Sequence, residues 1–179
     1  MKTIYKMPKY LFHYHDIQKL SIAELSQTLW DTEGLPMKDC KISDLVFYQG
    51  EPIYSGNGVY LFRTKDEFIY VGDCVARNFV ERVPSHLDIR SGGWFNSLLK
   101  NTIKKRDKHP ILTDDLLTKA AQEVFDDFQL ILINFKSEDY NKVSINKLEY
   151  LLRIVMKPLN KFKTKWVEDW DILVENYVG

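Results

Sequence analysis

The sequence predicts an α+β fold: a small, three-stranded, mostly antiparallel sheet flanked by helices, with an N-terminal helical arm. Two short segments rich in aromatic and β-branched residues, GVYLF (58–62) and FIYVG (68–72), flank the polar segment RTKDE and are typical of a β-hairpin. A third segment, FQLILINF (128–135), is almost continuously apolar, as in a strand that is covered on both faces. Segments with helical periodicity lie before, between and after these strands.

Composition limits the class of protein. The chain has 179 residues and a formal net charge of zero, which fits one domain with a modest appendage and excludes a globally basic coat for nucleic acid. The two cysteines, Cys40 and Cys74, form neither a disulfide framework nor a zinc motif. No apolar run is long enough to span a membrane and no signal peptide is recognisable, so we expect an intracellular, cytoplasmic protein.

The first helix is predicted after Ser21, which has capping-box spacing with Glu24. A cluster of glycine, proline and asparagine at 49–58 then marks a division, so residues 1–57 are predicted to form the helical arm. Further helices are predicted after Asn78, over 94–105 and 113–125, and over 144–156, where Pro158 follows. The apolar face predicted for 94–105 consists of Trp94, Phe95, Leu98, Leu99 and Ile103.

Two motifs and four further residues carry a resemblance to a known family. The motifs GVY (58–60) and YVG (70–72) are followed by Arg82, His86, Glu149 and Asn160. In this order they resemble the GIY-YIG nuclease superfamily, over residues 58–160. The resemblance implies a nuclease-like domain at 58–165, with an acidic C-terminal tail at 166–179.

The resemblance implies a metal-dependent endonuclease that hydrolyses phosphodiester bonds in DNA. Tyr60 would take a proton from the attacking water, Tyr70 would orient water or phosphate, and Arg82 would stabilise the charge on phosphorus. His86 would share or relay the proton, and Glu149 would bind one Mg²⁺ or Mn²⁺ ion. Asn160 would contact phosphate or hold its loop. We expect these side chains to converge around one phosphate-sized gap.

Each of these residues also has a purely structural interpretation. The tyrosines could simply pack the hairpin, and they share a face only if an odd-numbered loop centred on Lys65 places them opposite one another. Gly58 and Gly72 would leave room for the phosphodiester, or would serve turns. Glu149 lies at the margin of the apolar stripe of its helix, where either a divalent cation or Arg153, four residues later, would compensate its charge.

Two basic segments stand out against the neutral whole. They supply the candidate nucleic-acid-binding residues Lys100, Lys104, Lys105, Arg106, Lys161 and Lys163. Such patches suit a polyanionic backbone, although charge runs also occur as ordinary solvated faces.

Several biological settings are compatible with the resemblance. The small size fits a stand-alone restriction-like enzyme as well as a homing or repair nuclease, and a homodimer would supply the two active sites needed to cut both strands. The alternative is a catalytically silent module on the same fold that binds nucleic acid or protein. A third reading is an unrelated small α+β protein.

Overall fold

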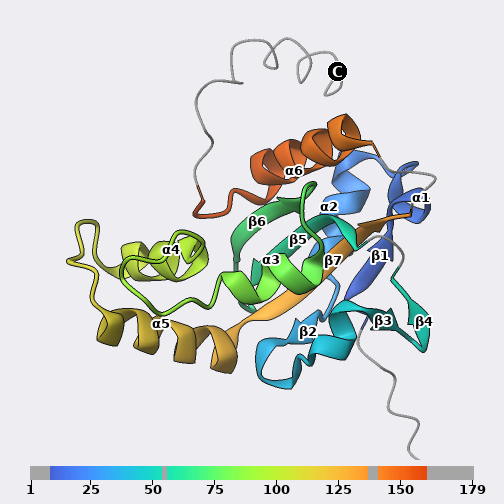
Figure 1. Ribbon diagram of the computed structural model, residues 1–179. Coiled ribbons are helices and arrows are strands. Elements are labelled where there is room, and N and C mark those ends of the chain that lie inside the picture. Colours follow the sequence, from blue (N-terminus) through green and yellow to red (C-terminus); the bar gives the residue numbers. More distant parts are fainter. Residues whose placement is uncertain (1–8, 54–55, 137–140, 161–179) are drawn as a thin grey trace, which may run out of the picture.

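The computed structural model describes residues 9–53, 56–136 and 141–160 and has an α+β architecture (Figure 1). Its main sheet runs in the order β1-β7-β5-β6, and β2 also pairs with β7. The strands of this sheet are β1 (Leu11–His13), β2 (Leu35–Pro36), β5 (Asn57–Arg63), β6 (Phe68–Cys74) and β7 (Gln129–Phe135). A separate ribbon pairs β3 (Phe47–Tyr48) with β4 (Glu51–Pro52).

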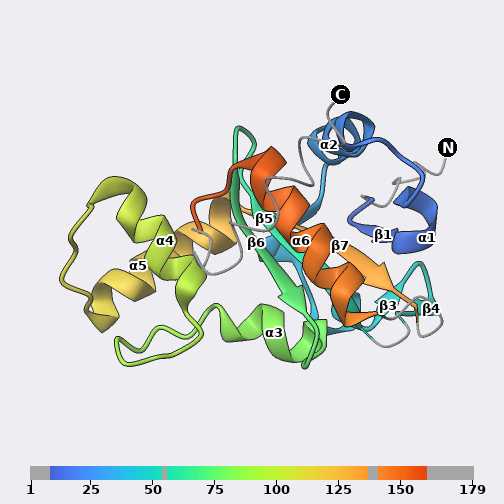
Figure 2. The same ribbon diagram turned by 90° about the horizontal axis from the view of Figure 1, so that it is seen from above.

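Helices cover both faces of the sheet (Figures 1 and 2). The α-helices are α1 (Tyr14–Ile17), α2 (Ile22–Trp30), α3 (Phe79–Ser85), α4 (Ser97–Arg106), α5 (Asp114–Asp127) and α6 (Lys142–Met156). Two short 3₁₀ helices, η1 (Met37–Asp39) and η2 (Ile42–Leu45), lie in the N-terminal part. The predicted caps are present, because Ser21 forms a capping box with Glu24 and Asn78 accepts from Glu81 N.

The predicted hairpin is confirmed, but its register differs from the prediction. Tyr60 lies opposite Gly72, Phe62 lies opposite Tyr70, and the register shifts between Phe62 and Arg63. The tyrosines are therefore diagonal neighbours rather than a directly opposed pair. They still share a face, because Phe62, which lies opposite Tyr70, is two residues from Tyr60 along the same strand. Their rings stack with centroids 6.1 Å apart.

The sheet is larger than predicted, because the N-terminal part contributes two strands to it. The strands β6, β5 and β7 are antiparallel, as expected, but β1 adds a parallel partner to β7 and β2 adds a short antiparallel one. Leu11 and Phe12 of β1 are buried on opposite faces. Strand β7 is apolar on both sides and would otherwise leave an exposed edge, which accounts for its recruitment of these distant segments.

Arg63 ties the N-terminal part to the hairpin. Its Nη1 donates to the carbonyl oxygens of Leu29 (3.2 Å) and Trp30 (2.9 Å) at the end of α2. A cation stabilises the negative end of a helix dipole, and the bonds satisfy carbonyls that lack helical partners. Residues 9–53 are therefore packed into the domain, whereas the sequence predicted an arm.

The sheet separates two hydrophobic clusters, which define two faces. The α3–α5 face carries Tyr60, Phe62 and Tyr70, covered by side chains of α3, α4 and α5. The α6 face carries Val59, Leu61 and Val71, covered by α2 and α6. Alternate residues of β5 and β6 thus face different helices.

One predicted helical face is incorrect. Helix α4 begins at Ser97, and Trp94 and Phe95 lie in the segment before it, with 91% and 37% of their surfaces exposed. Leu98, Leu99 and Ile103 are buried, as predicted. After the Ser91-Gly92-Gly93 turn, residues 94–96 form bends and a further turn, so the two aromatic residues do not join the helical stripe.

Some predictions fall outside the described residues. These are the acidic tail at 166–179 and the basic residues Lys161 and Lys163. Within 9–53, 56–136 and 141–160, no helix has the length and apolar character needed to cross a membrane.

Candidate functional site

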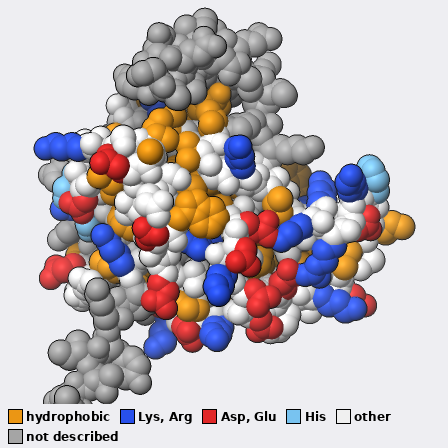
Figure 3. Space-filling view, turned by 180° about the vertical axis from the view of Figure 1, so that it is seen from behind, with side chains coloured by type: hydrophobic (Ala, Val, Ile, Leu, Met, Phe, Trp, Pro, Cys, Tyr) orange, Lys and Arg blue, Asp and Glu red, His pale blue; other side chains and the backbone are white. Residues whose placement is uncertain are grey.

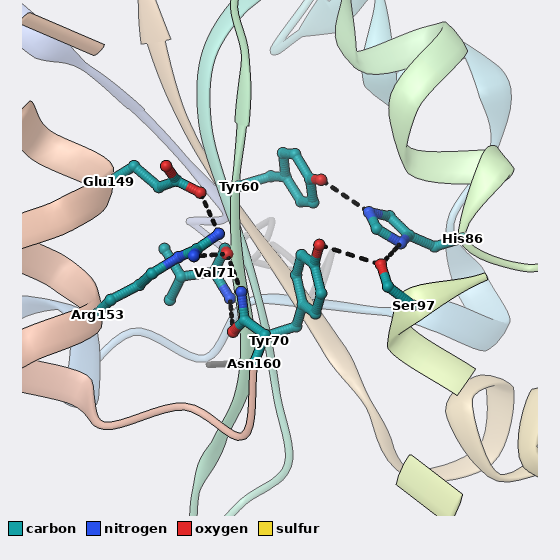
Figure 4. A network of polar contacts seen from close by, with 8 residues as sticks. All are labelled: Tyr60, Tyr70, Val71, His86, Ser97, Glu149, Arg153 and Asn160. Atoms are coloured by element: carbon teal, nitrogen blue, oxygen red, sulfur yellow. Dashed lines mark hydrogen bonds and ion pairs between the residues drawn. The ribbon is translucent and has the colours of Figure 1, made fainter. Parts of the chain in front are cut away.

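A polar cluster lies inside the α3–α5 face, where β5 and β6 meet α3 and α4 (Figure 4). The Tyr60 hydroxyl is 2.7 Å from His86 Nε2, and both side chains are fully buried. Tyr60 comes from the middle of β5, and His86 is the residue that caps the C-terminus of α3. Because the buried hydroxyl and the buried imidazole form a hydrogen bond with one another, neither has the free-energy cost of a buried polar group without a partner.

Tyr70 and Ser97 complete this cluster. Ser97 Oγ, at the start of α4, donates to the Tyr70 hydroxyl at 3.1 Å, and it lies 3.5 Å from His86 Nδ1. The His86 ring also has a hydrogen bond to the Phe95 backbone. Neutral His86 carries one ring proton, and the tautomer with this proton on Nδ1 is the one that can accept from the Tyr60 hydroxyl. Nε2 is then the acceptor for the Tyr60 hydroxyl.

Burial and Arg82 determine the protonation states of the cluster. Burial, followed by the Arg82 charge, lowers the pKa of His86 to about 3, so the ring is neutral near pH 7. Burial also raises the pKa of Tyr60 well above 10, and the nearby Arg82 guanidinium opposes this rise. The expected neighbours Tyr60, Tyr70, Arg82 and His86 are therefore brought together, as a neutral phenol–imidazole pair beside a cation.

The glycines in the two motifs accommodate protein atoms. A Cβ at Gly72 would lie 2.3 Å from the Tyr60 hydroxyl oxygen, so the phenol ring occupies the space that this glycine provides. A Cβ at Gly58, whose φ is +154°, would lie 1.9 Å from the Ile133 carbonyl oxygen. The sequence-based interpretation that both glycines leave room for a phosphodiester is thus incorrect for this structure: Gly72 admits a side chain and Gly58 admits the β7 backbone.

Glu149 does not join the phenol cluster. It lies on α6, on the other side of β6 from Tyr60, Tyr70 and His86 (Figure 4). Arg153 Nη2 donates to Glu149 Oε1, the i,i+4 ion pair considered as the structural interpretation, and only 14% of the Glu149 side chain is exposed. Arg153 Nε also donates to the Val71 carbonyl at 3.3 Å, which fixes the pair against β6.

Asp73 is a neighbour of Glu149 that the sequence reasoning missed. Burial is the main cause that raises the pKa of Glu149 to about 7, Arg153 opposes it, and Asp73 raises it further. Asp73 also interacts electrostatically with Arg82. Because β6 is the outer strand of the sheet, Asp73 links the Arg82 cluster to Glu149 at the sheet's edge.

Asn160 is a structural residue in this arrangement. Its Oδ1 accepts from Val71 N at 3.0 Å, and its Nδ2 donates to Val71 O at 2.6 Å. The side chain thus imitates a neighbouring strand along the open edge of β6, and Leu159 N adds a bond to Ile69 O at 3.1 Å. The resemblance implied that Asn160 contacts phosphate or holds its loop. Because its side-chain amide bonds to the Val71 backbone, the geometry matches the role of holding the loop.

The basic residues of α4 are partly neutralised. Lys105 pairs with Glu67 and Arg106 pairs with Glu123, while Lys100 Nζ donates to the Gly93 carbonyl at 3.0 Å. Lys104 is exposed. From behind, basic and acidic side chains alternate over the α4–α5 end of the molecule, at the right of Figure 3.

Two residues of the site had weak signals in the sequence. Asp73 directly follows the YVG motif, and Ser97 stands three residues after Trp94 in what was expected to be mid-helix. Because α4 begins at position 97, the Ser97 hydroxyl lies at the end of the helix and contacts the Tyr70 hydroxyl.

Comparisons with known proteins add no family assignment. No protein-family model, no curated protein and no solved structure matches this chain.

Proposed function

We propose that this chain is a metal-dependent endonuclease that hydrolyses phosphodiester bonds in DNA. The observation that supports this most directly is the contact between the Tyr60 hydroxyl and His86 Nε2 beside Arg82, inside an otherwise apolar layer. Apolar side chains of similar size would fill this space without the cost of desolvating polar groups. A cluster of such groups, assembled from β5, β6, α3 and α4, is what a site for proton transfer requires.

The hydrogen bond gives the proton a route. As an attacking water loses its proton to the Tyr60 oxygen, the Tyr60 proton passes to His86 Nε2, so the phenol never needs to exist as a free phenolate. Burial and Arg82 make His86 a weak base in the free protein. A phosphodiester bound to Arg82 would neutralise the guanidinium and remove one of these two causes, which raises the basicity of His86 when substrate is present.

The residues fit a divalent cation only in part. Among the described residues there is no group of three or more His, Cys, Asp or Glu side chains that could hold a metal. Glu149 and Asp73 are nevertheless neighbouring carboxyl groups, and Mg²⁺ is commonly held by one or two carboxylates with waters and substrate phosphate. On this proposal they would hold one Mg²⁺ or Mn²⁺ ion, which supplies Lewis-acid polarisation of a phosphoryl oxygen.

The silent nucleic-acid-binding or protein-interaction module is the second candidate, and two observations favour it. Tyr60 is fully buried, and Glu149 lies across β6 from it, paired with Arg153. In this alternative the polar cluster positions α3 and α4, and Arg82 presents its charge to a ligand without any chemistry.

A cleavage assay with matched variants separates the two candidates. Purified full-length protein with Mg²⁺ or Mn²⁺ is incubated with supercoiled plasmid, linear duplex and single-stranded DNA. We expect cleavage, and we expect Tyr60→Phe to lower its rate about 10²- to 10⁴-fold, as for loss of a group that transfers the proton. Glu149→Gln should also abolish cleavage, with Mg²⁺ as well as with Mn²⁺.

Tyr14→Phe is the control, because it removes a hydroxyl from a ring that stacks on Phe135 on the α6 face. It should cut like the wild type. If Tyr60→Phe folds and cuts at the wild-type rate, the proton route is wrong. If the wild type binds DNA but leaves every substrate intact with both metals, the silent module is the better description.

A further inference from the structure

The segment that joins α3 to α4 holds an aromatic side chain in solvent. Trp94 is 91% exposed, whereas most large apolar side chains of the described residues are covered. An indole gains free energy from leaving water, and tryptophan is highly buried on average, so this ring is a candidate for contact with a ligand. The segment runs along the outside of the molecule beside α4 and α5 (Figure 2).

This exposure belongs to a well-tethered loop. Gly93 N donates to the Arg90 carbonyl at 2.8 Å, and Asn96 Nδ2 donates to the same oxygen at 2.9 Å. Lys100 Nζ from α4 donates to the Gly93 carbonyl at 3.0 Å. A Cβ at Gly93 would lie 2.9 Å from the Arg90 carbonyl oxygen, a backbone atom, so the turn favours glycine at this position. The backbone on both sides of Trp94 is therefore fixed, and the side chain is held outward.

The residue beside Trp94 connects this surface to the candidate site. The Phe95 ring has two guanidinium groups near it, Arg77 at 4.6 Å and Arg82 at 5.4 Å from the ring centroid. Neither arginine makes a salt bridge with another described residue. Arg82 also faces Tyr60, and the Phe95 backbone bonds to His86. The exposed aromatic pair thus continues directly into the polar cluster.

We infer that Trp94, Phe95 and Arg77 form a stacking surface for an unpaired base of a single-stranded or locally opened DNA substrate. The ligand class rests on the proposed function. Aromatic rings stack on bases of any sequence, and unpaired arginines bind the neighbouring phosphates, which is how proteins hold single-stranded nucleic acid. A base stacked on Trp94 would place the next phosphate of the strand toward Arg82. A protein partner would also use Trp and Arg, but two guanidinium groups beside the rings, neither of them in a salt bridge with a described residue, favour a polyanion.

The test measures binding in EDTA, so that cleavage cannot interfere. The probe is a fluorescein-labelled single-stranded DNA about 12 nucleotides long, compared by anisotropy with an abasic strand of equal length and charge. We expect Trp94→Ala to weaken binding of the normal strand about 5- to 150-fold, the range for loss of one base–aromatic stack. The abasic strand should bind wild type and variant equally, since it offers no base to stack.

Two further variants control for general effects. Ile111→Ala removes another large apolar side chain, 87% exposed in the segment between α4 and α5, and should bind like the wild type. Trp94→Phe keeps an aromatic ring and should retain most of the affinity. Equal binding by wild type and Trp94→Ala, or by normal and abasic strands, would overturn the inference. A change of oligomeric state in Trp94→Ala, measured by light scattering, would assign the surface to a protein contact and overturn it too.

The result is separable from that of the cleavage assay. If the normal strand binds through Trp94 but no DNA is cut, the stacking surface stands and the hydrolase proposal fails. If DNA is cut and Trp94→Ala cuts and binds like the wild type, the hydrolase proposal stands and the stacking surface fails.

Discussion

The two faces of the sheet are built from different kinds of side chain. The buried side chains of the cluster on the α6 face are all aliphatic, phenylalanine or methionine. The α3–α5 face is equally well covered, yet it contains Tyr60, Tyr70 and the buried imidazole of His86. Both faces belong to the same strands and have similar burial, so burial alone does not explain the difference. The apolar cluster of the α6 face serves packing, and the charged groups Glu149, Arg153 and Asp73 lie beside it at the edge of the sheet. The polar groups of the α3–α5 face lie inside the cluster and need an additional explanation.

The largest expected effect tests the α6 face. Leu61 is fully buried in β5 and contributes only apolar contacts. Leu61→Ala should lower the free energy of unfolding by about 2–5 kcal/mol, because it removes buried surface and leaves a cavity. Urea denaturation followed by circular dichroism measures this. A cost well below 1 kcal/mol would show that this face is not tightly packed.

Its neighbour in β5 tests the other face. Tyr60→Phe keeps the ring and removes only the hydroxyl, which leaves His86 Nε2 without its donor. The expected loss is about 1–3 kcal/mol, the cost of one buried group without a partner. The same denaturation experiment applies. A loss larger than that of Leu61→Ala would reverse the comparison, because stability would then depend more on the polar face.

Acid should act through His86 on the α3–α5 face. Its folded pKa of about 3 lies below the ordinary value of 6.5, so the unfolded chain binds a proton first as the pH falls. The contribution is fully present above pH 6.5 and is lost between about pH 6.5 and 3, by at most about 1.4 kcal/mol per pH unit. The raised pKa of Glu149, about 7, adds a contribution of opposite sign between pH 7 and its ordinary value of 4.5. The slope due to His86 is therefore measured as the difference in unfolding free energy between the wild type and His86→Gln across this range.

The exposed His109 provides the matched control. His109→Gln should leave the dependence of stability on pH as it is in the wild type. If His86→Gln retains the full slope, His86 is not the group whose protonation opposes folding.

The smallest effect is expected at the edge that joins the two faces. Asn160→Ala removes two buried hydrogen bonds to Val71, but the Val71 carbonyl keeps the bond from Arg153 Nε. Because β6 is an outer strand, loss of the Asn160 side chain opens Val71 N to water. The expected cost is therefore about 1 kcal/mol, near the net value of one hydrogen bond. Thermal denaturation should detect it, with the exposed Asn146→Ala on α6 as the control. A loss of more than 3 kcal/mol in the free energy of unfolding would mean that the two Asn160 hydrogen bonds stabilise much more than the edge of β6.

Local sequence patterns predicted most of the elements but not all of their partners. The hairpin, β7 and helices α2, α3, α5 and α6 follow from apolar periodicity and capping residues that act within a few positions. Strand β1 is three residues long and pairs with β7 more than a hundred residues away. Nothing within so short a segment encodes such a partner, because the pairing is decided by the free edge of β7.

The candidate site was predictable in part for the same reason. Arg82 and His86 share the end of one helix and reach Tyr60 from it, so their spacing was informative. Glu149 was expected nearby from order along the chain alone, but the face on which α6 packs depends on the whole sheet. The one-residue alternation of β6 places Tyr70 on one side and Val71 with Asp73 on the other, which separates Glu149 from the phenols.

Gly72 and Tyr60 share a single volume across the hairpin. With a Cβ at position 72 only 2.3 Å from the phenol oxygen, an alanine there and a tyrosine at position 60 exclude one another in this conformation. In a library randomised at both positions, folded variants should therefore pair any larger residue at 72 with a smaller one at 60. Such a compensating pair would keep the hairpin and lose the hydroxyl that contacts His86, so wherever the phenol is needed, position 72 should remain glycine.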